Sequence, residues 1–253
     1  MSGLWLFLSF PVGAEEARSE SLYQISSALD GAVIGAGALA TLLPYALSPQ
    51  LIVPRCPCDA QEVNSLDRGV IGNASNTADV LSNVTVALAV ALPVALDLYQ
   101  VGLHRPFFED MVVYAEGIAV SSAAVTVTKY LVQRPLPRTY AGDPALVRVP
   151  GGYRSFYSGH TNLVMVALTT ASMTYVSRNG PGWLPWVLTA AVGVVVGAER
   201  VLAGLHFYSD VAVGALAGAG FGLLIPYLHR HPATRLAVVP SAGGATLSWI
   251  GRF

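Results

Sequence analysis

Six apolar stretches, each close to the length needed to cross a lipid bilayer, dominate this sequence. They lie at residues 28–47, 78–99, 111–132, 161–176, 183–203 and 208–228. A helix needs about 20 mostly apolar residues to span the hydrocarbon core. Because lipid offers no partners for backbone polar groups, such stretches must satisfy their hydrogen bonds internally. The sequence therefore predicts an all-α polytopic membrane bundle of about six transmembrane helices with a short extended C-terminal tail.

Composition supports this fold class. The 253-residue chain is 53% hydrophobic and only 11% charged, whereas soluble domains carry about 25% charged residues. The net charge of −1 gives no indication of a nucleic-acid partner. We therefore expect a membrane environment, no nucleic-acid partner and no required protein partner.

The chain divides into three parts. Residues 1–27 form an apolar segment with a polar lead-in, and their first 14 residues resemble a signal peptide that lacks a positive n-region. The alternative is a short hydrophobic helix lying on the membrane. Residues 28–228 are predicted to form one six-helix domain. Residues 229–253 form a tail, in which weak alternation around Gly243-Gly244 favours a small hairpin.

Other polar positions leave alternatives open. Cys56 and Cys58 lie in a long polar link as two free thiols or a local disulfide, because zinc needs more ligands than this pair supplies. Asp97 and Glu116 interrupt apolar spans. Each of these carboxylates either pairs within the bundle or lies nearer an interface.

Further polar groups gather at the ends of particular spans. Lys129 ends the third span, Ser158-Gly159-His160 precedes the fourth, Arg200 ends the fifth and His206 begins the sixth. In an antiparallel bundle, the links after spans one, three and five lie on one side. Each charged residue alone is explained by anchoring at the interface. Their convergence on one face favours a shared site.

The residue types suit metal-free phosphoryl transfer. His206 and Asp210 are four residues apart, on one face of a helix. A carboxylate there can fix the imidazole tautomer and free the other ring nitrogen as a nucleophile. The remaining groups supply a helix N-terminus and cations suited to phosphate oxygens: Ser158, Gly159, Lys129 and Arg200.

This pattern resembles the type 2 phosphatidic acid phosphatase superfamily over roughly residues 28–228. The family's third motif is Ser-Arg, five residues, His, three residues, Asp. It fits at Arg200, His206 and Asp210, with Glu199 in place of serine. The second motif, Pro-Ser-Gly-His, fits at 158–160, with tyrosine in place of proline.

The first family motif, Lys, six residues, Arg-Pro, is matched only in part. Lys129 and Pro137 fit, but Leu136 occupies the position of the family's arginine. Arg134 and Arg138 lie within two residues of it. We expect one of these arginines to replace the missing cation at the phosphate, with Arg138 favoured because it follows Pro137 and enters a flexible link.

The resemblance implies a role for each matched residue. His206 attacks phosphorus and forms a phosphohistidine, while Asp210 orients His206. His160 protonates the leaving oxygen and then activates the hydrolytic water. The phosphate is held by Lys129, Ser158, Gly159 and Arg200. No metal or cofactor is implied.

The implied activity is that of an integral membrane phosphatase, an acid phosphatase or lipid phosphate phosphatase that hydrolyses phosphomonoesters or pyrophosphates of lipids. The alternatives are a lipid phosphotransferase of the same superfamily and a non-catalytic membrane protein that retains part of the site. The implied location is a multi-pass protein of a bacterial-type cell membrane with the site facing the periplasm.

Overall fold

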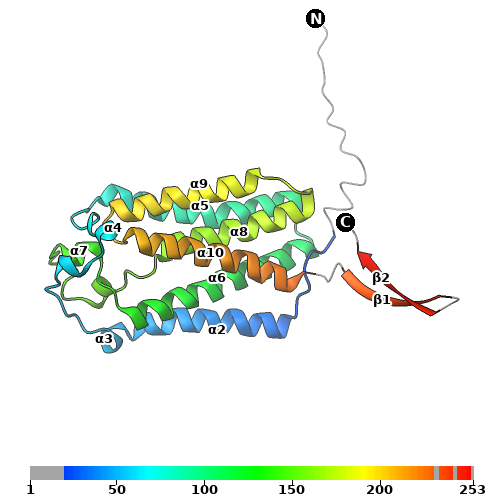
Figure 1. Cartoon of the computed structure of the whole chain (residues 1–253), viewed down its shortest axis with the longest axis horizontal. Coiled ribbons are helices and arrows are strands. Elements are labelled where there is room, and N and C mark those ends of the chain that lie inside the picture. The colour runs from blue at the N-terminus through cyan, green and yellow to red at the C-terminus, as the bar shows by residue number, and fades with distance from the viewer. Residues whose placement is uncertain (1–19, 231–233, 242–243, 252–253) are drawn as a thin grey trace, which may run out of the picture.

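The computed structural model describes residues 20–230, 234–241 and 244–251 of the chain. Within this part, six long helices run side by side and form an all-α bundle (Figure 1). Each coincides with one of the six apolar stretches, which confirms the predicted fold class. The helices are α2 (Ser27–Ala46), α5 (Asn76–Val101), α6 (Arg105–Val132), α8 (Gly159–Asn179), α9 (Leu184–Leu202) and α10 (Tyr208–His229).

Five of these helices are long and apolar enough to cross a membrane, and α8 is the exception. Helix α8 packs against α5, α6, α9 and α10 and therefore lies in the middle of the bundle. Its buried side chains include Thr161, Asn162, Thr169 and Thr170. Because protein rather than lipid surrounds α8, its hydroxyl and amide groups find partners there and need not be apolar.

The outer surface of the bundle is apolar. Leu39 of α2, Leu88 of α5, Val194 of α9 and Leu216 of α10 are each more than 60% exposed. Exposed apolar area on several helices of one molecule marks a surface that another apolar phase covers. These faces therefore suit contact with lipid tails, as expected for a membrane protein.

A row of glycines brings α10 close to α8. A Cβ atom at Gly214 would lie 2.7 Å from the carbonyl oxygen of Ser158, and one at Gly218 would lie 2.4 Å from that of Asn162. Gly222 makes an equally close approach to α8, with a Cβ 2.7 Å from the Cβ of Thr169. Small residues at such spacing let membrane helices touch through their backbones. This contact fixes the beginnings of α8 and α10 side by side.

Three links meet at one end of the bundle (Figure 1). The α2–α5 link contains α3 (Ser48–Leu51), the 3₁₀ helix η1 (Ala60–Glu62) and α4 (Ser65–Arg68). The α6–α8 link contains α7 (Pro137–Tyr140) and the 3₁₀ helix η2 (Pro150–Tyr153). The α9–α10 link is short and contains His206. The sequence predicted that these same three links lie on one side of the bundle.

The features outside the bundle are small. Strands β1 (Thr234–Ser241) and β2 (Gly244–Gly251) pair as an antiparallel hairpin after α10. Cys56 and Cys58 form a disulfide in the α2–α5 link, which decides between the two states left open by the sequence. The segment 1–14, which resembles a signal peptide, lies outside the described residues.

Candidate active site

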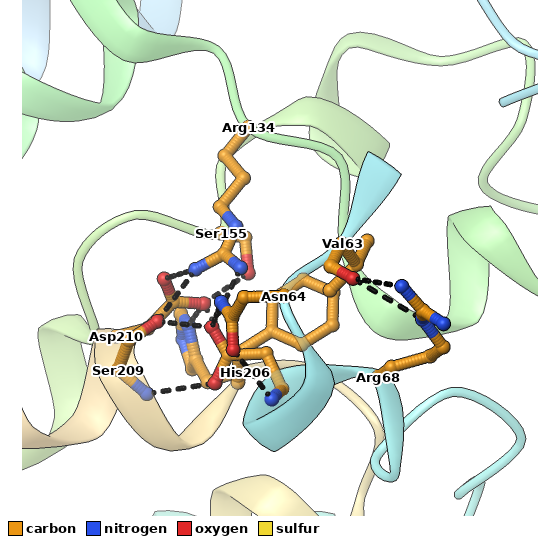
Figure 2. A network of polar contacts seen from close by, with 10 residues as sticks. Val63, Asn64, Arg68, Arg134, Ser155, His206, Ser209 and Asp210 are labelled. Atoms are coloured by element: carbon orange, nitrogen blue, oxygen red, sulfur yellow. Dashed lines mark hydrogen bonds and ion pairs between the residues drawn. The ribbon is translucent and has the colours of Figure 1, made fainter. Parts of the chain in front are cut away.

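Asp210, in the first turn of α10, is the centre of the polar network at the link-bearing end (Figure 2). Its side chain is fully buried. Oδ2 accepts hydrogen bonds from the backbone amide of Phe207 at 2.9 Å and from the hydroxyl of Ser155 at 2.5 Å. Oδ1 accepts one from Arg134 Nη1 at 2.6 Å. Asp210 therefore caps its own helix and joins it to the α6–α8 link.

Arg134 bridges two buried carboxylates. Besides Asp210, it binds Asp67 of α4 through Nη2 at 2.8 Å, and its guanidinium lies 4.0 Å from the centre of the Phe207 ring. Burial raises the pKa of Asp67, but hydrogen bonds from Arg134, Ser209 and its other neighbours outweigh this and hold it below the usual value. Arg134 thus serves as the counter-ion of two aspartates.

His206 lies beside Asp210 in the α9–α10 link. Its Nδ1 is 3.8 Å from Asp210 Oδ2, which is an ion-pair distance and longer than a hydrogen bond. No described residue makes a hydrogen bond to Nδ1. Burial, reinforced by the positive charge of Lys129, lowers the pKa of His206 to about 3. The imidazole is therefore neutral near pH 7, the state that a nucleophile requires.

The beginning of α8 is bound to the beginning of α10. Ser158 caps α8 with its side chain, and its backbone amide donates to the carbonyl oxygen of Asp210 at 3.0 Å. His160 follows in the first turn, and its Nε2 lies 2.9 Å from Asn83 Oδ1 of α5. The bond between Ser158 and Asp210 thus joins the beginnings of α8 and α10 directly.

Lys129 and Arg200 are buried cations close enough to the two histidines for their charges to act on both rings. Lys129 Nζ donates to the backbone carbonyl oxygens of Arg154 and Ser155. Arg200 Nη1 donates to Asp79 Oδ1 at 2.7 Å and to a serine hydroxyl of α5, while its Nε has no hydrogen-bond partner among the described residues. Both charges act on His206 and on His160, so the structure brings the two cations and the two histidines together.

The region around Leu136 has a different character. Leu136 is buried, and its amide donates to the carbonyl oxygen of Gly152. Arg138 Nε pairs with Asp143 Oδ2 at 2.9 Å, within its own link. Both arginines that the sequence offered as substitute cations, Arg134 and Arg138, therefore already hold carboxylates in this structure.

Sequence reasoning missed several residues of the site. Asp79 and Asn83 of α5 hold Arg200 and His160, and Ser155 holds Asp210. A signal for the first two was present, because polar residues one helical turn apart interrupt an otherwise apolar span. Ser155 gave no such signal, since serine is common in links.

Comparisons with known proteins bear on this site. Residues 110–232 match the family model described as the PAP2 superfamily. The crystal structure of Aquifex aeolicus LpxE is similar at 25% sequence identity and a TM-score of 0.45, covering 63% of this chain and 92% of that one. A search of curated proteins finds no match.

The matched region begins inside α6 and ends just beyond α10. It contains Lys129, the Ser158-Gly159-His160 segment, Arg200, His206 and Asp210. The family match and the clustered residues therefore fall on the same part of the molecule, and this part, residues 110–232, is similar to the PAP2 superfamily.

Proposed function

We propose that this protein is a membrane phosphatase that hydrolyses phosphomonoesters or pyrophosphates of lipids through a phosphohistidine at His206. One observation carries the proposal. The Ser158 amide binds the Asp210 carbonyl, and the charges of Lys129 and Arg200 act on the histidines there. Nucleophile, proton donor and phosphate-binding cations thus share one end of the bundle.

The proposed reaction has two steps. Neutral His206 attacks phosphorus, the bond from phosphorus to the leaving oxygen breaks, and His160 protonates that oxygen. His160, now neutral, then takes a proton from water, and the resulting hydroxide attacks the phosphohistidine. Inorganic phosphate and free His206 are the products, and no redox partner is needed.

The charge that develops on the phosphoryl oxygens needs positioned donors. Lys129 uses two of its three N–H groups on backbone carbonyls and keeps one for phosphate. Arg200 is fixed by Asp79 and offers Nε, which is buried and has no partner among the described residues. Gly159, the first residue of α8, adds a backbone N–H group, while the amide of Ser158 is already bound to the carbonyl oxygen of Asp210.

Asp210 has a positioning role in this scheme. The distance of 3.8 Å between His206 Nδ1 and Asp210 Oδ2 becomes a hydrogen bond when substrate is bound, since catalytic contacts often shorten in the complex. Asn83 orients His160 in a similar way.

A lipid substrate and a periplasmic site are also part of the proposal. The apolar faces of the helices place the bundle in lipid, so that a lipid head group reaches the bundle end laterally while its tails stay in the bilayer. The Cys56–Cys58 disulfide lies in a link at this same end. Disulfides persist mainly in oxidising compartments such as the periplasm, which supports a site facing outward from a bacterial-type cell membrane.

Phosphate release from phosphatidic acid and from a prenyl pyrophosphate by the purified protein tests this function. We expect turnover that survives EDTA and is inhibited by vanadate, which mimics five-coordinate phosphorus. With a membrane-impermeant, short-chain phosphate ester, intact and lysed cells are expected to show equal activity. No hydrolysis of any lipid phosphate would disprove the function. Transfer of phosphate to a second lipid would identify a phosphotransferase instead, and activity only after lysis would reverse the orientation.

The pH dependence of kcat/KM provides a second test. Because burial lowers the pKa of His206 to about 3, the nucleophile stays neutral when pH falls from 7 to 5. Burial and the charge of Arg200 lower the pKa of His160, the acid that protonates the leaving oxygen, to about 4. More of this acid is therefore protonated as pH falls, and we expect kcat/KM to rise between pH 7 and about pH 5 and to fall at alkaline pH. Initial rates are measured where full activity returns on readjustment to pH 7. An acid limb near the ordinary histidine pKa of about 6.5 would contradict the assignment.

A further inference from the structure

Three ionisable side chains meet inside the bundle at the end opposite to the candidate active site. They are Asp30 of α2, Glu116 of α6 and His229 at the end of α10, and one ligand atom from each lies within 4.8 Å of the other two. Asp30 and Glu116 are buried, and the His229 side chain is 13% exposed. At 1.5 Å rise per residue, α10 separates this cluster from His206 by about 30 Å.

The distances within the cluster are unusual for hydrogen bonds. His229 Nε2 lies 3.5 Å from Asp30 Oδ1 and 3.4 Å from Glu116 Oε2. A charge-assisted N–H···O bond is about 2.7–2.9 Å long. Ligands placed about 2.0–2.2 Å from a tetrahedral zinc ion are about 3.3–3.6 Å from one another. The two distances from His229 therefore suit a cation held between the three groups, and the two carboxylate oxygens lie within 4.8 Å of each other.

Backbone groups outside the cluster orient two of the three ligands by hydrogen bonds. His229 Nδ1 lies 2.9 Å from the carbonyl oxygen of Ile225, and since that oxygen only accepts, Nδ1 carries the proton. In the neutral ring, the lone pair of Nε2 then faces the two carboxylates. Asp30 accepts a bond from the Ser26 amide through Oδ2 at 2.8 Å and turns Oδ1 toward the cluster. Metal-binding side chains are commonly held in this way.

Glu116 supplies an independent indication of a ligand. The residue is 6% exposed, and no described residue makes a hydrogen bond to its buried Oε2. A buried carboxylate oxygen without a hydrogen bond is costly. Two carboxylates and a neutral imidazole balance the charge of one divalent cation, which would remove this cost.

We propose that Asp30, Glu116 and His229 bind one divalent transition-metal ion, with Zn²⁺ as the best fit. Imidazole together with carboxylates suits zinc better than Mg²⁺ or Ca²⁺, which prefer oxygen ligands alone. Water fills the remaining position. The ion ties α2 to α10 across α6 and stabilises the bundle, and it takes no part in the chemistry at His206.

Metal binding by the full-length protein tests the proposal directly. The protein is purified in detergent with a histidine-free affinity tag, stripped with chelator and titrated with Zn²⁺ or Co²⁺. We expect one ion per chain by elemental analysis, a higher unfolding temperature, and visible Co²⁺ absorption typical of tetrahedral coordination. Phosphate release per folded molecule is expected to be unchanged by the metal.

Variants locate the ion. Asp30→Asn, Glu116→Gln and His229→Gln are each expected to weaken metal binding at least about 100-fold, because each removes a ligand. His104→Gln, an exposed histidine before α6 at the same end of the bundle, is the matched control and keeps full binding. A double Cys56→Ser, Cys58→Ser variant also keeps it, which excludes a site on sulfur.

The titration of the wild-type protein tests the metal site even where a variant fails to fold. Substoichiometric zinc without any rise in unfolding temperature would overturn the proposal and leave a charged His229 paired with two acids. Equal binding by His229→Gln would overturn it as well. Neither result depends on whether the protein hydrolyses lipid phosphates.

Discussion

Replacing His206 with asparagine is expected to lower phosphate release at least about 10³-fold, because no other group replaces a lost nucleophile. Asparagine keeps a polar side chain of similar reach in the fully buried position beside Asp210. The fold should therefore survive while turnover is lost. His104→Asn, which changes an exposed histidine at the other end of the bundle, is the matched control and is expected to keep full activity.

The measurement includes a search for the covalent intermediate. With a ³²P-labelled phosphate ester whose leaving group needs no proton, His160→Asn should accumulate label that is stable in base and lost in acid, because the first step proceeds while the water that releases phosphate is no longer activated. Adding the His206→Asn change to that variant should remove the label. Substantial turnover by His206→Asn, or label that persists in the double variant, would refute the phosphohistidine route.

Replacing Arg134 with alanine is the second change for which we expect a large effect. Arg134 binds Asp210 at 2.6 Å and Asp67 at 2.8 Å, and both carboxylates are completely buried. Removing one partner of a buried ion pair typically costs about 3–5 kcal/mol, since a charge is left without compensation. We expect a loss of about 3 kcal/mol in unfolding free energy, because Arg134 itself is 19% exposed, together with nearly complete loss of activity.

Arg138→Ala is the matched control. Its pair with Asp143 is partly exposed on both sides, and such pairs contribute about 1 kcal/mol or less. Unfolding in detergent and kcat and KM for phosphate release are measured for both variants. If Arg134 contacts the phosphate directly, Arg134→Ala will raise KM and leave stability unchanged. That result, or a larger loss of activity in Arg138→Ala, would contradict the positioning role inferred from the structure.

The substitution Leu136→Arg distinguishes the same two roles of Arg134, contact with the phosphate and positioning of the carboxylates. Leu136 is buried at 6% exposure, so an arginine there must displace packed neighbours before it reaches a phosphate. We therefore do not expect this one substitution to restore the phosphate-binding arginine of the family's first motif. The arginine pattern beside Leu136 predicted a substitute phosphate cation, whereas the folded chain uses Arg134 to hold the carboxylate beside His206.

The sequence by itself determined the six helices and the end of the bundle where the site lies. Helix formation follows from hydropathy, because a span in lipid must satisfy its own backbone hydrogen bonds. The position of the links follows from counting spans, because each crossing reverses the direction of the chain. These two rules were enough to bring Lys129, His160 and His206 to one end, with no knowledge of side-chain packing.

Only the tertiary structure decided which helix is enclosed and which polar groups meet. The sequence predicted residues 161–176 as one of six equivalent spans, whereas α8 is enclosed by α5, α6, α9 and α10 and is the one long helix of the described bundle that is not apolar enough to cross a membrane. Several contacts join groups that are tens of residues apart in the sequence. They are the ion pair of Arg134 with Asp67, the ion pair of Arg200 with Asp79, and the cluster of Asp30, Glu116 and His229. Such contacts depend on the rotation and depth of each helix against its neighbours, which apolar length does not fix.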